Sequence, residues 1–177
     1  MSILPIVEAP DERLRKKSKP VKGLDKKAKK FISDMHQTLS TQKDPEGVGL
    51  AAPQVGKNLQ IFVVNYDGHK LTVINPKVIA KNPPPHKRSG EASKKIPLEG
   101  CLSIPNHYSP ITRPTKIKIK FLDETGQEKT QEFTGFSAQV IAHEIDHLQG
   151  KLFIDHVLAQ QTPLYKIMGE DWEEIEI

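Results

Sequence analysis

Two histidines and a glutamate near the end of this 177-residue chain have the types and spacing of a metal site that cleaves amide bonds. In the stretch HEIDH, His143 and His147 are four positions apart, so in a helix they point the same way. Glu144 lies about 100° around the helix axis from His143, where it can flank a metal ion without binding it. A divalent metal lowers the pKa of bound water, and a nearby carboxylate can then take and deliver its proton. The stretch therefore predicts a metal-dependent hydrolase.

A catalytic metal site usually has three protein ligands, and the sequence offers several candidates for the third. Cys101, the single cysteine, lies in a short segment between Gly100 and Pro105, and its thiolate would be a strong ligand for zinc or ferrous iron. The plain interpretation of a lone cysteine is a small buried hydrophobe. The other candidates are a carboxylate downstream of the helix and His36, His69, His86, His107 and His156. Spacing alone does not choose among them.

The stretch from residue 23 to 42 predicts an amphipathic N-terminal helix, because its apolar residues recur at helical spacing. These residues are Leu24, Ala28, Phe31, Ile32, Met35 and Leu39. Residues 43–56 follow with three glycines and two prolines, which predicts a loop or a short edge segment.

Two β-hairpins are predicted between this helix and the metal motif. Apolar runs flank an Asp-Gly turn at residues 67–68, which favours a hairpin and leaves room for a third strand. Further on, Ile117, Ile119 and Phe121 alternate with lysines before the turn DETGQ, which predicts a hairpin with one buried face.

The metal motif lies on a predicted helix with Ser137 as its N-cap and Gly150 just past its end. Strands grouped in hairpins, with helices near the two ends, indicate an α+β fold. We expect antiparallel β-sheets packed around the helix that carries HEIDH, in the C-terminal half of the chain.

The whole chain, residues 1–177, is expected to form a single catalytic domain. Residues 81–97 are rich in proline and basic residues and predict an exposed loop insertion. Residues 158–177 form a weakly assigned tail, in which Pro163 ends an element and a short helix follows. The sequence has no apolar run of roughly 18 residues and no signal-like N-terminus, so we expect a cytoplasmic protein that meets no membrane.

The positive charge of the chain is concentrated near its N-terminus. The net charge is +4, and residues 13–30 hold ten lysines or arginines. Such a basic face can meet RNA or the surface of a ribosome, although a solvated helix face is the simpler interpretation. No aromatic residues are interleaved with the lysines, and we expect no specific DNA binding.

Three stretches together resemble the peptide deformylase family: GVGLAAPQ at 47–54, EGCLS at 99–103 and HEIDH at 143–147. They match the family's signature motifs in the right order, and the resemblance spans about residues 5–157. It implies a hydrolase that removes the formyl group from the N-terminal formylmethionine of nascent polypeptides and releases formate.

The resemblance also implies the residues of the site. Cys101, His143 and His147 would bind one divalent metal ion, typically ferrous iron, with zinc, nickel or cobalt as substitutes. Glu144 would be the general base and acid.

Gln54 and the backbone N–H of Leu102 would hold the formyl oxygen as it becomes negative. The substrate-binding residues implied by the resemblance are Val48, Gly49, Glu99, Gly100, Tyr108, Gln139 and Val140.

Two positions depart from the family pattern. Many members carry arginine where this chain has Tyr108, so a contact with the substrate backbone must be weaker, indirect or supplied elsewhere. Gln139 stands where an aliphatic residue often lines the methionine pocket, so its polar group either turns aside or narrows the side-chain preference.

Three further expectations can be tested. The resemblance places an arginine near Asp146, so Arg113 is expected to pair with this acid and fix the helix that carries the ligands. A zinc endopeptidase is the alternative enzyme, with a carboxylate or histidine as third ligand in place of Cys101. A metal-stabilised binding module on the ribosome is the alternative outside enzymes, with salt-dependent RNA binding and no turnover.

Overall fold

The computed structural model describes residues 2–43, 47–66, 68–84, 98–169 and 171–175. This described part of the chain forms three α-helices, two short 3-10 helices and nine strands. In chain order they are η1 (Glu12–Arg15), α1 (Lys26–Thr41), β1 (Gly49–Ala51), η2 (Ala52–Val55), β2 (Ile61–Tyr66), β3 (His69–Lys81), β4 (Glu99–Cys101), β5 (Ile104–Ser109), β6 (Lys116–Leu122), β7 (Glu128–Thr134), α2 (Gly135–Leu148), α3 (Phe153–Gln160), β8 (Leu164–Met168) and β9 (Asp171–Ile175).

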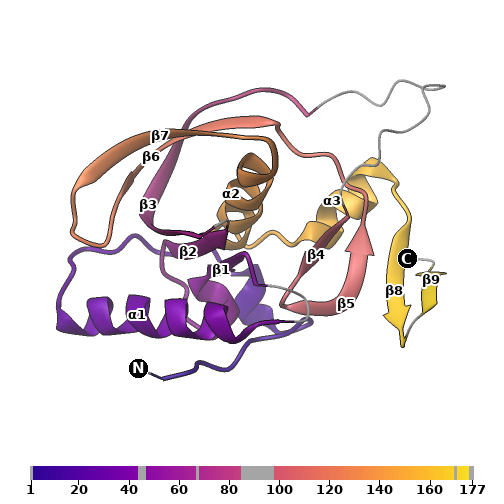
Figure 1. Cartoon of the computed structure of the whole chain (residues 1–177), viewed down its shortest axis with the longest axis horizontal. Helices are drawn as coiled ribbons and strands as arrows, with labels where there is room; N and C mark the ends of the chain where they lie inside the picture. The colour runs from indigo at the N-terminus through magenta and orange to yellow at the C-terminus, as the bar shows by residue number, and fades with distance from the viewer. Residues whose placement is uncertain (1, 44–46, 67, 85–97, 170, 176–177) are drawn as a thin grey trace.

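The strands form two sheets in which all neighbouring strands run antiparallel. The first has the order β1-β2-β3-β6-β7 and the second the order β4-β5-β8-β9. Figure 1 shows α2 in the interior, with the five-stranded sheet on one side and β4 and β5 on the other. The predicted α+β class is confirmed, and the helix that carries HEIDH is the central element.

Helix α1 forms where its apolar stripe predicts it. The side chain of Asp25 accepts a hydrogen bond from the backbone N–H of Ala28 at 2.8 Å and so caps the first turn. Ile32, Met35 and Leu39 are buried in the core between α1 and the first sheet. A fully buried side chain of this kind contributes about 1.5–3 kcal/mol. The stretch after α1, predicted to be a loop or a short edge segment, supplies the edge strand β1.

Both predicted hairpins are present, but the third strand expected after the first hairpin is not a separate element. β3 continues through that stretch, with an irregular register between Ile74 and Lys77. Asn75 absorbs the irregularity with a φ of 52°, a left-handed conformation that asparagine tolerates. Its side chain accepts a hydrogen bond from the N–H of Val21 at 2.8 Å and donates one to the carbonyl of Val21 at 2.9 Å.

Helix α2 begins earlier than predicted, and Ser137 is not its N-cap. The cap is Thr134, the last residue of β7, and the helix starts at Gly135. Gly135 has a φ of 57°, which glycine adopts readily, and its N–H donates to the carbonyl of Thr115 at 2.8 Å. The chain therefore passes directly from strand to helix. Gly150 does lie just past the end of α2, with a φ of 75°.

The C-terminal tail differs from the prediction. α3 lies before Pro163, and the element after it is the β8–β9 hairpin rather than a short helix. β8 pairs with β5, where Tyr165 is opposite Tyr108 and Lys166 is opposite His107. The open edge of β5 thus decides the conformation of this segment, because pairing with it satisfies backbone groups that a helix would satisfy internally.

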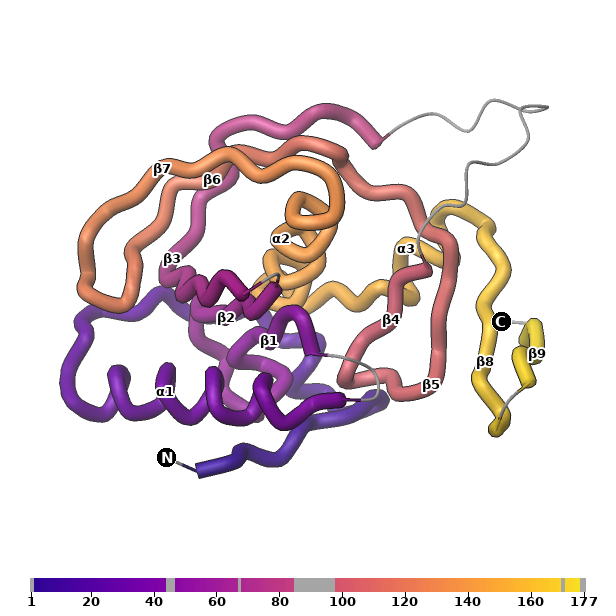
Figure 2. The backbone as a smooth tube through the Cα atoms, in the orientation of Figure 1, coloured from indigo at the N-terminus to yellow at the C-terminus, as the bar shows by residue number. Residues whose placement is uncertain are grey.

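The N-terminal segment forms backbone hydrogen bonds with both η2 and the turn between β4 and β5. The N–H of Val7 donates to the carbonyl of Gln54 at 2.7 Å, and the N–H of Ala9 donates to the carbonyl of Ser103 at 2.9 Å. Figure 2 shows this segment running alongside α1 toward β5. It therefore holds the end of η2 against the turn between β4 and β5.

Most of the predicted 81–97 insertion lies outside the described residues. Its first four residues, 81–84, are exposed or half-exposed. Within the described parts of the chain, no helix combines the length and the apolar character needed to cross a membrane.

Candidate metal centre

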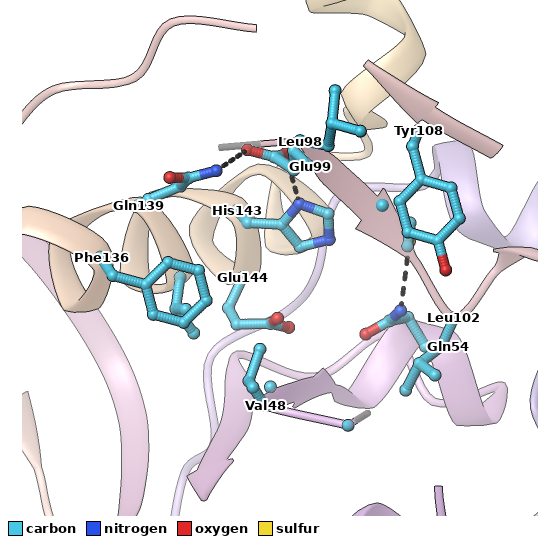
Figure 3. Close-up of a pocket in the computed structure, with 15 residues that line it drawn as sticks. Val48, Gln54, Leu98, Glu99, Leu102, Tyr108, Phe136, Gln139, His143 and Glu144 are labelled. Atoms are coloured by element: carbon cyan, nitrogen blue, oxygen red, sulfur yellow. Dashed lines mark hydrogen bonds and ion pairs between the residues drawn. The ribbon is translucent and has the colours of Figure 1, made fainter. Parts of the chain in front are cut away.

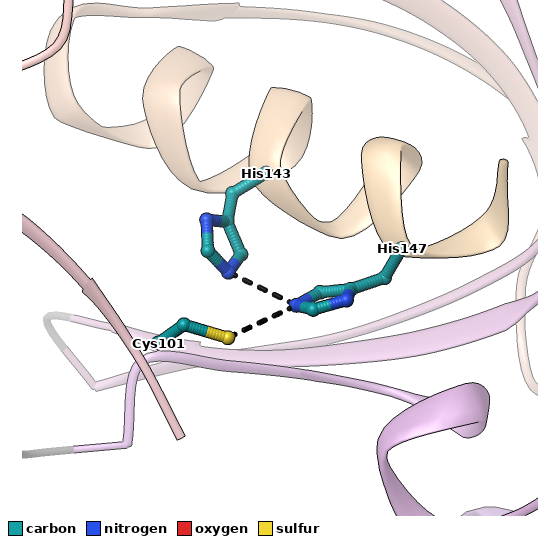
Figure 4. A group of neighbouring side chains, drawn as sticks. All are labelled: Cys101, His143 and His147. Atoms are coloured by element: carbon teal, nitrogen blue, oxygen red, sulfur yellow. Dashed lines mark hydrogen bonds between the residues drawn. The ribbon is translucent and has the colours of Figure 1, made fainter. Parts of the chain in front are cut away.

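Three potential ligands meet at the middle of the molecule. His143 and His147 lie one turn apart on α2, and Cys101 ends β4 opposite them (Figure 4). The Nε2 atom of His147 is 3.2 Å from the Sγ atom of Cys101 and 3.2 Å from the Nε2 atom of His143. All three residues are buried, and their ligand atoms lie within 4.8 Å of one another. Of the candidates for the third ligand that the structure describes, Cys101 is the one grouped with His143 and His147.

The orientation of His143 is set by Glu99, on the first residue of β4. The Nδ1 atom of His143 is 2.7 Å from a carboxylate oxygen of Glu99. A carboxylate only accepts, so Nδ1 carries the hydrogen and Nε2 is turned toward Cys101 and His147. This is the arrangement that metal-binding histidines usually have.

The electrostatics of the three residues fit a cation. Burial raises the pKa of the Cys101 thiol, but the rings of His147 and His143 outweigh it and lower the pKa to about 5. A thiol in this position favours the thiolate, which is the form that binds metals. A soft sulfur ligand with two imidazoles suits a transition metal such as zinc or iron, so the residues present fit the ion that the sequence predicts.

Arg113 is the centre of the buried charge network behind the ligands. Its guanidinium donates two hydrogen bonds to Glu99, at 2.6 and 2.9 Å, and is itself buried. Burial raises the pKa of Glu99, but His143 and Arg113 outweigh it and hold that pKa well below its usual value. Glu99 is therefore an anion that links Arg113 to a ligand.

The predicted pair of Arg113 and Asp146 is present. The guanidinium also donates to Asp146 on α2. Nε2 of His156 on α3 lies 2.7 Å from the same carboxylate oxygen. Burial raises the pKa of Asp146, but His156 and Arg113 outweigh it and lower the pKa to about 2. Arg113 thus connects α2 and β4, the two elements that carry the ligands.

A cavity of about 280 Å³ opens beside the ligands (Figure 3). Cys101 and His143 form part of its wall, and His147 is not among its lining residues. The other predicted site residues that line it are Val48, Gly49, Gln54, Glu99, Gly100, Leu102, Tyr108, Gln139, Val140 and Glu144.

Glu144 lines this cavity, and one oxygen of its carboxyl group has no partner among the described residues. Oε2 is buried and makes no hydrogen bond among the described residues. Burial is the largest influence on this carboxyl group and raises its pKa to about 7. A buried carboxyl group with a pKa near neutrality can both take up and release a proton.

The side-chain amide of Gln54 points at the ligands. Its oxygen accepts a hydrogen bond from the N–H of Ala51 at 2.8 Å. Its Nε2 group is left to donate, and it lies 3.5 Å from Sγ of Cys101 and 3.3 Å from Oγ of Ser103. An N–H donor is therefore fixed beside the ligands, with Leu102 next to it in the wall of the cavity.

Gln139 turns its amide aside from the cavity. Its Nε2 group donates to Glu99 at 3.2 Å, so the polar residue joins the anion that orients His143. Tyr108 lies over Gly100, where a Cβ atom would be 2.6 Å from the Cε1 atom of the tyrosine ring.

Several residues of the site were not predicted. Gly47, Leu98 and Phe136 line the cavity, and Phe136 contacts Tyr66 with ring centroids 4.9 Å apart. Gly47 stands within the GVGLAAPQ stretch and could have been included from it. Leu98 lies before the EGCLS stretch and Phe136 before the HEIDH stretch, and no sequence pattern marks either residue as part of a site.

The remaining ligand candidates lie elsewhere. Nε2 of His36 is 2.8 Å from Oγ1 of Thr72, and Nδ1 of His107 is 2.7 Å from the carbonyl of Pro105. His69 is exposed in β3, and His86 falls outside the described residues.

Comparisons with known proteins agree on one family. The model of the polypeptide deformylase family matches residues 3–162. A peptide deformylase of Nitrosococcus oceani is 41% identical over 159 residues, which are 88% of this chain and 87% of the relative. The solved peptide deformylase of Legionella pneumophila is 35% identical with a TM-score of 0.77, covering 90% of this chain and 92% of its own. The peptide deformylase of Synechococcus elongatus, solved in complex with actinonin, is 35% identical with a TM-score of 0.75. The match covers 86% of this chain and 78% of that chain.

Proposed function

This chain belongs to the peptide deformylase family, and we propose that the cavity beside Cys101, His143 and His147 is where it hydrolyses the formyl group of N-terminal formylmethionine. The protein is a hydrolase that acts on nascent polypeptides and releases formate. The observation that carries the assignment of the site is the position of Glu144. Glu144, which has an unpartnered oxygen among the described residues, lines the same cavity as Cys101 and His143, and His147 completes the group of three.

Cys101, His143 and His147 would hold one divalent metal ion. When bound, such an ion would supply a positive charge and would lower the pKa of a water molecule. Ferrous iron is the ion that we propose, with zinc, nickel or cobalt as substitutes, because thiolate and imidazole ligands suit all four.

Glu144 would move the proton in the reaction. Its pKa of about 7, raised by burial, suits a group that accepts a proton from the attacking water and later gives it to the leaving nitrogen. A cation held beside it would favour the carboxylate, so the group would begin the reaction as a base.

Gln54 and the backbone N–H of Leu102 would hold the formyl oxygen as it gains negative charge. The amide of Gln54 is already oriented for this, since Ala51 fixes its oxygen and leaves Nε2 to donate. Donors fixed before the reaction stabilise developing charge without reorganisation.

Val48, Gly49, Gly100 and Val140 would contact the peptide, because they form the apolar and backbone walls of the cavity. Glu99 and Gln139 line the cavity but bond to each other, so we assign them mainly to the orientation of His143.

We also propose a cytoplasmic location and a contact with the ribosome through the basic N-terminal face. The lysines and arginines of residues 13–30 are all exposed, including those of η1 and α1. Exposed cations attract phosphate groups of RNA, and such an attraction weakens with salt.

Formate release tests the proposal. The protein is purified without oxygen, its metal content is measured, and formate is assayed with a formyl-Met-Ala-Ser peptide. We expect formate in proportion to bound metal and its loss in the Glu144→Gln variant. No formate from a sample loaded with iron or nickel would refute the proposed function.

A further inference from the structure

The single tryptophan of the chain contacts a residue that lines the cavity. Trp172 lies on β9, and its ring centroid is 5.4 Å from that of Tyr108 on β5, with the planes tilted by 53°. Such tilted aromatic pairs attract each other beyond the area that they bury. Tyr108 lines the cavity, and Trp172 supports it from the neighbouring hairpin.

The register of the second sheet places both rings on one face. Tyr108 is opposite Tyr165, and Tyr165 is opposite Glu174. Residues opposite each other share a face, as do residues two apart on a strand, so Trp172 lies on the face of Tyr108. On the other side, Gly100 is opposite Tyr108 and offers no side chain. The tyrosine ring is therefore held between a bare backbone and the indole ring.

The pair extends the apolar rim of the cavity toward solvent. Trp172 is 51% exposed, and Leu98, which also lines the cavity, is 42% exposed. Tyr108 lies between the cavity and the indole ring, so the rings form an aromatic surface that starts at the cavity and continues outward.

We propose that Trp172 is a positioning residue that holds Tyr108 at the mouth of the cavity, and that the two rings select formylated peptides with an apolar, above all aromatic, side chain at one of the two positions after the methionine. The inference rests on the proposed function, because it concerns the same substrate. A peptide whose first residue occupies the cavity must leave through its mouth, and its next side chains meet this rim. Aromatic faces bind apolar side chains by burial and by ring contacts.

Steady-state kinetics on the metal-loaded enzyme test the inference. The substrates are formyl-Met-Ala-Ala, formyl-Met-Ala-Phe and formyl-Met-Phe-Ala, and the variants are Trp172→Ala and Trp172→Phe. We expect the wild type to favour one phenylalanine peptide through a lower KM. Trp172→Ala should raise KM for that peptide by about three- to tenfold, the worth of one aromatic contact, with kcat changed less than about twofold. Trp172→Phe should restore most of the preference.

A matched control comes from the same hairpin. Met168 is 53% exposed and alternates onto the opposite face of the sheet, so Met168→Ala should leave all three KM values unchanged. Equal losses for all peptides in Trp172→Ala, or no loss, would overturn the inference. A wild type that releases formate from all three peptides without preference would also overturn it and leave the proposed function intact. A wild type that releases none would refute the proposed function instead.

Fluorescence gives a second readout, because Trp172 is the only indole in the chain. Emission excited at the red edge of indole absorption should change when the favoured peptide is mixed with the enzyme and return as the peptide is consumed. Constant emission throughout turnover would contradict the placement of Trp172 at the path of the substrate.

Discussion

Gly49 lies against the carboxylate of Glu144. A Cβ atom at position 49 would overlap Oε1 of Glu144 and lie 2.9 Å from its Cδ atom. Gly49 belongs to the edge strand β1, and Glu144 belongs to the central helix. Any side chain at position 49 would force the carboxylate of Glu144 to shift, so glycine at this position helps to set where the proposed base lies in the cavity.

Gly49→Ala should displace Glu144 and slow the reaction. A shift of about 1 Å in a reacting group can cost about 100-fold, so we expect kcat to fall by one to two orders of magnitude. Metal content should stay near that of the wild type, because the ligands are on other residues. Gly23→Ala is the matched control, since a Cβ atom at position 23 meets nothing within 4 Å. Equal kcat values for Gly49→Ala and Gly23→Ala would contradict the prediction.

Glu144→Gln should abolish formate release and stabilise the metal-free protein at high pH. The pKa of Glu144 is about 7 in the folded chain and 4.5 as a free group, so the folded state binds more protons between these values. Stability then falls as the pH rises through this window, and glutamine removes the loss. At pH 8 the gain in unfolding free energy should reach at most about 3 kcal/mol, at about 1.4 kcal/mol per pKa unit.

Urea unfolding of chelator-treated protein at pH 4 and pH 8 measures this effect of Glu144→Gln. The variant and the wild type should converge at pH 4, where both side chains are neutral in the folded state. Glu132→Gln, on an exposed glutamate of β7, should show no such gain. If the variant were no more stable than the wild type at pH 8, the buried charge of Glu144 would not lower the free energy of unfolding, and the prediction would fail.

Arg113→Ala should destabilise the fold, because it leaves Glu99 and Asp146 without their buried cation. Removal of one partner from a buried ion pair costs about 3–5 kcal/mol. We expect a loss of this size in urea unfolding, together with weaker metal retention, since Glu99 orients His143. Arg13→Ala provides the comparison, because the pair of Arg13 and Asp11 is at the surface. Equal stability and metal retention in Arg113→Ala and wild type would refute this role.

Cys101→Ser separates the deformylase site from the endopeptidase alternative. A serine hydroxyl is a poor ligand for a transition metal, so bound metal should be lost. Formate release should fall by more than the roughly 10–100-fold that follows loss of a hydrogen-bond partner of a ligand. Metal analysis and the formate assay on one sample measure both. A variant that keeps its metal and its activity would place the third ligand elsewhere.

Local periodicity let the sequence determine the parts of the site that lie on one element. A four-residue spacing places His143 and His147 on one side of a helix wherever that helix packs, and the apolar stripe of α1 likewise defines its buried side. The alternation of Ile117 with its neighbours predicted a half-buried hairpin for the same reason.

Contacts between distant segments were decided only by the tertiary structure. Cys101 is 42 residues from His143, and spacing alone did not single it out as the third ligand. The tertiary structure, which places β4 opposite α2, brings it to the two histidines. No local pattern in the sequence indicated the two hydrogen bonds from Arg113 to Glu99, the start of α2 at Gly135 or the strand that puts Trp172 beside Tyr108. Each depends on which backbone edges and charges remain to be satisfied once the rest of the chain has packed, and this is a property of the whole fold.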